Sequence, residues 1–173
     1  MIKLLFTAAA LLTVNIVSLY SIRTSDVDNN LINFNDYRGK KILIVNTASG
    51  SNKVSQLTAL QQLYSQHHDS LVVIAFPSNS FGNEPKTNAE IKAFMRGSYG
   101  ITFPIAAKSD VTGSRMNALY QWLGSKLQNE VTNGQTHSDF QKYLVDKKGV
   151  IVGVYDSSIN PLGTVMEEAI GRY

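Results

Sequence analysis

The chain has 173 residues, of which 43% are hydrophobic and 17% are charged, and its formal net charge at pH 7 is +3. These values are typical of one globular domain and exclude an intrinsically disordered chain. The chain contains no Cys, which excludes disulfides and thiolate-based zinc sites. No basic stripe interleaved with aromatic residues occurs, so we expect no nucleic-acid partner.

The first segment, residues 1–21, is predicted to be a signal peptide or an N-terminal membrane anchor. Lys3 precedes an apolar run over residues 4–20. A short cationic region before a hydrophobic region is typical of secretory signal peptides. Ser18 and Ser21 offer small residues near which cleavage could occur, whereas an uncleaved run would be nearly long enough to span a bilayer. We therefore expect an exported protein, periplasmic or extracellular. The alternatives are a membrane-anchored protein and a buried first helix.

The stretch from 41 to 64 organises the chain. Residues 42–45 form a continuous apolar run, which predicts a strand that is covered on both faces. A polar loop follows over residues 46–55. The recurrence of Leu57, Leu60 and Leu63 then predicts an amphipathic helix. In open α/β sheets, such a loop lies at the carboxyl end of a strand, where ligands bind.

Further apolar segments predict the remaining core strands. Residues 71–76 form a second apolar run, and residues 140–146 and 150–155 flank a turn that ends at Gly149, which predicts a β-hairpin. With the strand at 41–46, these segments are the expected core strands.

Helical spacing predicts the other elements. Asn88 is expected to cap a second helix. The inward residues of this helix are expected to be Ile91, Phe94 and Met95. A third helix carries Trp122, which we expect in the core, and residues 161–170 form a closing helix. The order of strands and helices predicts an α/β fold with a mixed central sheet flanked by helices.

Four motifs occur in order along the chain: NTAS at 46–49, FPSNSFG at 76–82, YGITFP at 99–104 and SDFQKYLVD at 138–146. With these motifs the chain resembles the glutathione peroxidase family. The resemblance implies a thioredoxin-like fold of the glutathione peroxidase type in one domain over 25–173. It also implies the family reaction, which is thiol-dependent reduction of hydroperoxides in the response to oxidative stress. Neither a cofactor nor a metal is expected. A monomer is implied, because the long insertion of tetrameric members is absent.

The catalytic positions implied by the resemblance are all substituted. Ser51 stands at the position of the nucleophilic Cys, Ser80 at that of the Gln, Ser138 at that of the Trp and Asp139 at that of the Asn. A serine hydroxyl is hardly ionised near neutral pH and has no reversible sulfenic state. An anionic Asp139 would also raise the pKa of a neighbouring thiol. We therefore predict a peroxidase-inactive pseudoenzyme that binds a small ligand or a protein partner in the vestigial cleft. Ser51, Ser80 and Asp139 should cluster at one end of the sheet.

Two enzymatic alternatives stay open. The first is an active oxidoreductase of the peroxidase family with an unrecognised mechanism. The second is a hydrolase built on Ser51, His137 and Asp139, although no G-x-S-x-G elbow surrounds Ser51. His67 and His68 are adjacent and do not share a helical face, so they do not predict a metal site.

Overall fold

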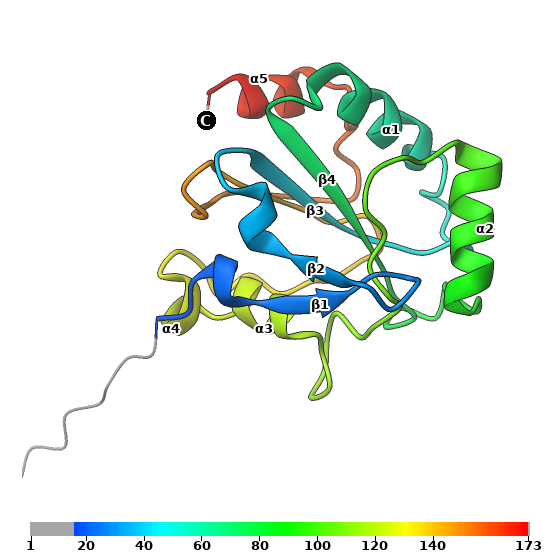
Figure 1. Ribbon diagram of the computed structural model, residues 1–173, viewed down its shortest axis with the longest axis horizontal. Helices are drawn as coiled ribbons and strands as arrows, with labels where there is room; N and C mark the ends of the chain where they lie inside the picture. Colours follow the sequence, from blue (N-terminus) through cyan, green and yellow to red (C-terminus); the bar gives the residue numbers. More distant parts are fainter. Residues whose placement is uncertain (1–15, 173) are drawn as a thin grey trace, which may run out of the picture.

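A mixed sheet of four strands forms the centre of the protein in the computed structural model, which describes residues 16–172 (Figure 1). The strands are β3 (Lys41–Thr47), β4 (Leu71–Pro77), β5 (Lys142–Val145) and β6 (Ile151–Tyr155), in the order β4-β3-β5-β6. β4 is parallel to β3, and β5 is antiparallel to both of its neighbours. The strands and the hairpin predicted from the apolar runs are confirmed. β5 begins later than residue 140, because Phe140 has a φ of 62° and cannot join the ladder.

Two layers cover the sheet (Figure 1). α1 (Gln56–His67), α2 (Asn88–Tyr99) and α5 (Thr164–Arg172) pack on one face. The hairpin β1 (Arg23–Ser25)–β2 (Leu31–Asn33), the short helices η1 (Leu19–Ser21) and η2 (Phe34–Tyr37), and α3 (Ala118–Leu123) pack on the other. α4 (Lys126–Asn129) follows α3. Alternate residues of β3 point into opposite layers, so Ile42 and Ile44 join one apolar cluster and Leu43 and Val45 the other. The predicted α/β fold with helices on a mixed sheet is confirmed.

The start of α2 differs from the prediction. Thr87, not Asn88, is the N-cap, and its hydroxyl accepts a hydrogen bond from Glu90 N while the Glu90 carboxylate accepts one from Thr87 N. This reciprocal capping box satisfies two backbone donors at the helix start, which a cap at Asn88 would not do. α5 begins at Thr164, after the predicted start at 161.

Part of the predicted leader belongs to the packed chain. Residues 1–15 lie outside the described residues, but Leu19 and Tyr20 are buried. Trp122 is buried as predicted, and its Nε1 donates a hydrogen bond to the Val17 carbonyl at 2.7 Å. The packed chain therefore includes residues before the predicted domain start at 25. Within residues 16–172, no helix is long and apolar enough to cross a membrane.

Candidate functional site

The carboxyl end of β3 and the segment before β5 meet at one edge of the sheet. Phe140 N donates a hydrogen bond to the Asn46 carbonyl at 2.7 Å, and Asn46 Nδ2 donates one to the Ser138 carbonyl at 2.8 Å. These bonds hold Ser138 and Asp139 beside the loop that follows β3. The two segments border an open hollow of about 420 Å³, which we call the Ser51 hollow. Its lining residues are Gly50, Ser51, Asn52, Lys53, Phe81, Asn83, His137, Ser138, Asp139 and Ser157.

Ser51 lies in the turn that leads into α1. Its residue surface is 6% exposed, and its Oγ accepts a hydrogen bond from Lys53 N at 3.3 Å. The Ser51 carbonyl accepts one from Val54 N at 3.1 Å. Ser51 is thus held in a defined turn between β3 and α1, within the polar loop that the sequence predicted there.

Asp139 is also 6% exposed. Its Oδ2 accepts a hydrogen bond from Asn83 Nδ2 at 2.6 Å, whereas its Oδ1 is buried and has no hydrogen-bond partner among residues 16–172. A buried carboxylate oxygen without a partner is unfavourable, and a bound group that donates a hydrogen bond would remove that penalty.

The loop after β4 forms hydrogen bonds with the loop after β3. Gly50 N donates to the Asn83 carbonyl at 2.8 Å, and a Cβ at Gly50 would lie 2.8 Å from the same oxygen. Glu84 is 2% exposed, and its carboxylate accepts hydrogen bonds from Ser49 N at 2.7 Å and Ser49 Oγ at 2.8 Å. Asn83 and Glu84 were not predicted as site residues, because their roles depend on contact between two loops.

Ser80 does not line the Ser51 hollow. Its Oγ accepts hydrogen bonds from Ser78 Oγ and Val111 N, both at 3.0 Å, and it borders a different depression beside Asp110 and Arg115. Of the four predicted positions, Ser51, Ser138 and Asp139 line the Ser51 hollow together, and Ser80 is not among its lining residues. The hydrogen bonds show the reason, since the short side chain is tied to its own loop and to Val111.

The hydrolase geometry is not formed among the described residues. No hydrogen bond links the side chains of Ser51, His137 and Asp139. Asp139 is bonded to Asn83 instead, and His137 is exposed, with its backbone N donating to Gln141 Oε1 at 3.0 Å. In a Ser–His–Asp triad the carboxylate is hydrogen-bonded to the imidazole, and the imidazole is hydrogen-bonded to the serine hydroxyl.

Positive charge lies beside the site. Lys53 lines the Ser51 hollow, and Lys142 is fully buried, with its Nζ donating a hydrogen bond to the Phe140 carbonyl at 2.9 Å. Burial lowers the pKa of Lys142 to about 8; the Asp156 carboxylate opposes this shift, and repulsion from Lys53 adds to it. Within residues 16–172, no group of three or more His, Cys, Asp or Glu side chains could hold a metal ion.

The fold is that of a thioredoxin-like protein. It combines a parallel β3–β4 pair with an antiparallel β5–β6 hairpin, flanking helices and a polar loop after β3. The model of the family described as "Glutathione peroxidase" matches residues 19–124. The chain belongs to the glutathione peroxidase family, as the four motifs predicted.

Similar proteins span nearly the whole described chain. The "Glutathione peroxidase-like peroxiredoxin gpx1" of Schizosaccharomyces pombe is 35% identical over 144 residues, which cover 82% of this chain and 90% of that protein. The "Glutathione peroxidase homolog BsaA" of Bacillus subtilis is 34% identical over 147 residues, covering 84% of this chain and 92% of that protein.

Solved structures agree with the fold. The crystal structure of Trgpx in apo form has a TM-score of 0.68 and 27% sequence identity, covering 90% of this chain and 97% of that chain. A thioredoxin-family thiol:disulfide interchange protein from Chlorobium tepidum has a TM-score of 0.63 at 14% identity, covering 91% of this chain and 98% of that chain. At that identity the second likeness shows the fold alone, and it confirms the thioredoxin-like class.

Proposed function

We propose that this member of the glutathione peroxidase family does not reduce hydroperoxides with thiols and instead binds a small polar molecule in the Ser51 hollow. One observation carries the proposal. Ser51 stands at the position of the family's nucleophilic Cys, and the chain has no Cys anywhere.

The chemistry of the family reaction requires sulfur. A thiolate attacks the peroxide O–O bond and becomes a sulfenic acid, which a second thiol then reduces. Ser51 has no such reversible oxidised state. Its hydroxyl accepts a hydrogen bond from Lys53 N, and no base among the described residues accepts its proton. A resolving Cys is also missing, so the chain cannot form an intramolecular disulfide.

The lining of the hollow supports a polar ligand. Lys53 and Asp139 offer opposite charges, and the Asp139 Oδ1 still needs a hydrogen-bond donor. A small molecule that carries both a donor group and an anionic group would match these two side chains. A protein loop with the same two groups is the other occupant that the hollow could accept.

Peroxide consumption tests the proposal. Hydrogen peroxide is mixed with the protein and either reduced thioredoxin or glutathione in a stopped-flow instrument. We expect consumption no faster than in buffer with the reductant alone. Ser51→Ala is the matched control. Turnover that scales with protein concentration would contradict the proposal. If Ser51→Ala kept that turnover, the mechanism would lie elsewhere in the chain.

We also propose that the N-terminal apolar run directs export. Lys3 and the apolar residues after it support this proposal. Leu19 and Tyr20 are buried in the packed chain, so we expect cleavage before Val17. Mass spectrometry of the mature N-terminus measures the cleavage point. An intact Met1 on protein from the cytosol would reject export.

A further inference from the structure

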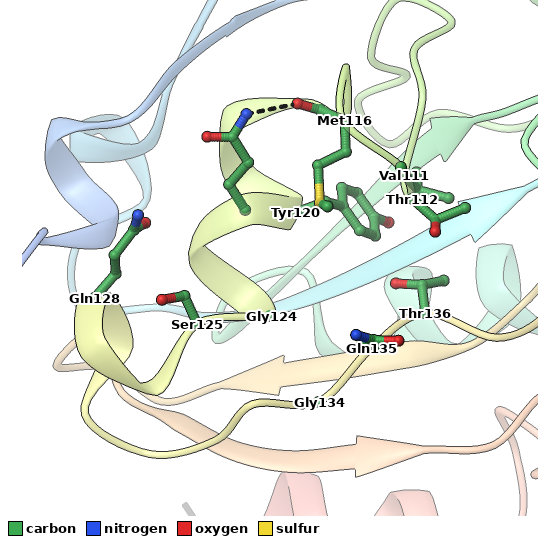
Figure 2. A pocket seen from close by; sticks show the side chains of 12 residues that line it. Val111, Thr112, Met116, Tyr120, Gly124, Ser125, Gln128, Gly134, Gln135 and Thr136 are labelled. Carbon is green, nitrogen blue, oxygen red and sulfur yellow. Dashed lines mark hydrogen bonds between the residues drawn. The ribbon is translucent and has the colours of Figure 1, made fainter.

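A second cavity, of about 460 Å³, lies between α3, the start of α4 and the loops at 111–116 and 134–136 (Figure 2). We call it the Tyr120 cavity. It shares no lining residue with the Ser51 hollow. Its volume is within the range of pockets that hold small organic molecules, about 300–1,000 Å³. The cavity is therefore a candidate site that is independent of the peroxidase positions.

The lining of the Tyr120 cavity carries no ionisable group other than the tyrosine itself. Val111, Met116 and the Tyr120 ring provide apolar surface, and Ser125, Gln128 and Gln135 provide neutral polar side chains. A charged ligand group buried here would have no counter-charge, which is strongly unfavourable. The lining therefore favours an uncharged molecule with a sizeable apolar part.

Tyr120 provides the specific polar group. Its residue surface is 2% exposed, and its hydroxyl is buried without a hydrogen-bond partner among residues 16–172. In Figure 2 the Tyr120 ring points away from its helix, and its hydroxyl appears between the labelled Thr112 and Thr136 side chains. Thr136 Oγ1 bonds to Tyr143 Oη at 2.9 Å and not to the Tyr120 hydroxyl. Burial raises the pKa of Tyr120 well above its usual value, so the hydroxyl keeps its proton and stays a donor.

The surrounding contacts keep the hydroxyl and one wall in place. The Tyr120 ring makes edge-on contacts with Phe76 and Tyr143, at centroid distances of 5.5 and 6.2 Å. Gln121 Nε2 donates to the Met116 carbonyl at 2.9 Å, which holds the Met116 wall (dashed line in Figure 2). A fixed donor in a neutral, half-apolar cavity is the arrangement by which small-molecule sites orient their ligands.

We propose that the Tyr120 cavity binds an uncharged, partly apolar organic molecule whose carbonyl-type oxygen accepts a hydrogen bond from the Tyr120 hydroxyl. The apolar part of the ligand lies against Val111 and Met116, where the thioether adapts to a ring. Binding gives the lone hydroxyl the partner that the protein itself does not supply.

Prodan, an uncharged dimethylamino-naphthyl ketone, is a suitable probe because its emission reports both polarity and hydrogen bonding at the carbonyl. Trp122 belongs to the same helix as Tyr120, so energy transfer from this single Trp reports occupancy. We expect saturable binding at one site. Tyr120→Phe should weaken it about tenfold, the effect of one hydrogen bond. An analogue with a methylene group in place of the carbonyl should bind the native protein and Tyr120→Phe equally.

Two further variants separate this site from non-specific binding. Thr112→Phe fills the cavity from an exposed lining position and should abolish binding. Tyr64→Phe removes a hydroxyl on the opposite face of the sheet and should leave binding unchanged. The proposal is overturned if Prodan does not bind up to its solubility limit, or if Thr112→Phe binds it as well as the native protein does. Equal affinity of Tyr120→Phe and the native protein for Prodan would overturn the role of the hydroxyl.

Discussion

Asn83 donates a hydrogen bond from Nδ2 to Asp139 Oδ2 at 2.6 Å, and this bond joins the loop after β4 to the segment before β5. Both residues line the Ser51 hollow. The shape of the hollow therefore depends on a neutral donor at position 83 facing a carboxylate at position 139.

Asn83→Asp should destabilise the protein above mildly acidic pH, because two carboxyl groups would face each other across a hydrogen-bond distance. Repulsion raises the pKa of the introduced carboxyl group in the folded state above its unfolded value of about 3.9. Stability relative to the native protein is therefore retained below about pH 4 and lost as the pH rises through the raised pKa. Urea unfolding at several pH values measures the change. Asn83→Ala should lose stability by an amount that does not depend on pH in this way. If the stability of both variants changed with pH in the same way, repulsion between the two carboxyl groups would not be the cause.

Gly50→Ala should destabilise the loop pair by about 1–3 kcal/mol, because the new Cβ would lie 2.8 Å from the Asn83 carbonyl oxygen and force two backbones apart. Gly97→Ala is the matched control on the exposed side of α2, where a Cβ meets nothing within 4 Å. It should stabilise by about 0.5–1 kcal/mol through helix propensity. Equilibrium urea unfolding compares the two, and equal effects would show that the close approach at Gly50 is unimportant.

Tyr120→Phe and Tyr143→Phe should differ in stability although both remove a buried phenolic hydroxyl. The Tyr120 hydroxyl has no partner among the described residues, so its removal should be neutral or stabilising by up to about 1 kcal/mol. The Tyr143 hydroxyl bonds to Thr136 Oγ1 and Gln141 Nε2, so its removal should cost about 1–3 kcal/mol. Thermal unfolding of the ligand-free proteins measures both. Equal losses would mean that the Tyr120 hydroxyl has a partner, such as a buried water.

The free energy of unfolding should rise with pH between about 7.5 and 9.5, by on the order of 1–2 kcal/mol. Burial lowers the pKa of Lys142 to about 8 in the folded protein, whereas the unfolded chain titrates near its ordinary value. The unfolded state therefore binds more protons than the folded state in this range, and loss of those protons favours folding. Lys142→Met should remove most of the rise. Burial also lowers the pKa of Lys41. The free energy of unfolding of Lys142→Met should therefore still rise with pH, with a smaller slope. If the free energy of unfolding of Lys142→Met rose with pH as steeply as that of the native protein, Lys142 would not be the group responsible.

Ser51→Cys alone should recover little peroxidase activity, because the new thiol would face Asp139 and lack the Gln, Trp and Asn donors of the family. Adding Ser80→Gln, Ser138→Trp and Asp139→Asn should raise turnover more than about tenfold over the single variant, since groups that act as one unit are non-additive. Stopped-flow peroxide turnover measures both proteins. Ser80 lies outside the Ser51 hollow, so the triple variant without Ser80→Gln shows whether a longer side chain must reach in from there. Equal turnover by the single and quadruple variants would contradict these roles.

The sequence by itself determined the class of protein and showed that the chain contains no Cys. Continuous apolar runs such as 42–45 and 71–76 predict buried strands, because such runs are stable only when covered on both faces. The spacing of the leucines in α1 predicts its helix in the same way, from neighbouring residues alone. The motifs around Asn46 and Phe76 identified the family, and the absence of Cys from the sequence is the basis of the proposal that the chain lacks thiol-dependent peroxidase activity.

The tertiary structure alone decided which polar groups meet. The cap of α2 is the exception, because Thr87 and Glu90 form a local T-x-x-E capping box that the sequence already carries. The bond between Asn83 and Asp139, and the bond from Val111 N to Ser80 Oγ, each join segments that are distant along the chain. The lone hydroxyl of Tyr120 follows in the same way from the packing of α3 beside two loops. Hydrogen-bond partners and cavities arise from the three-dimensional approach of such segments, and residue pattern along the chain does not encode that approach.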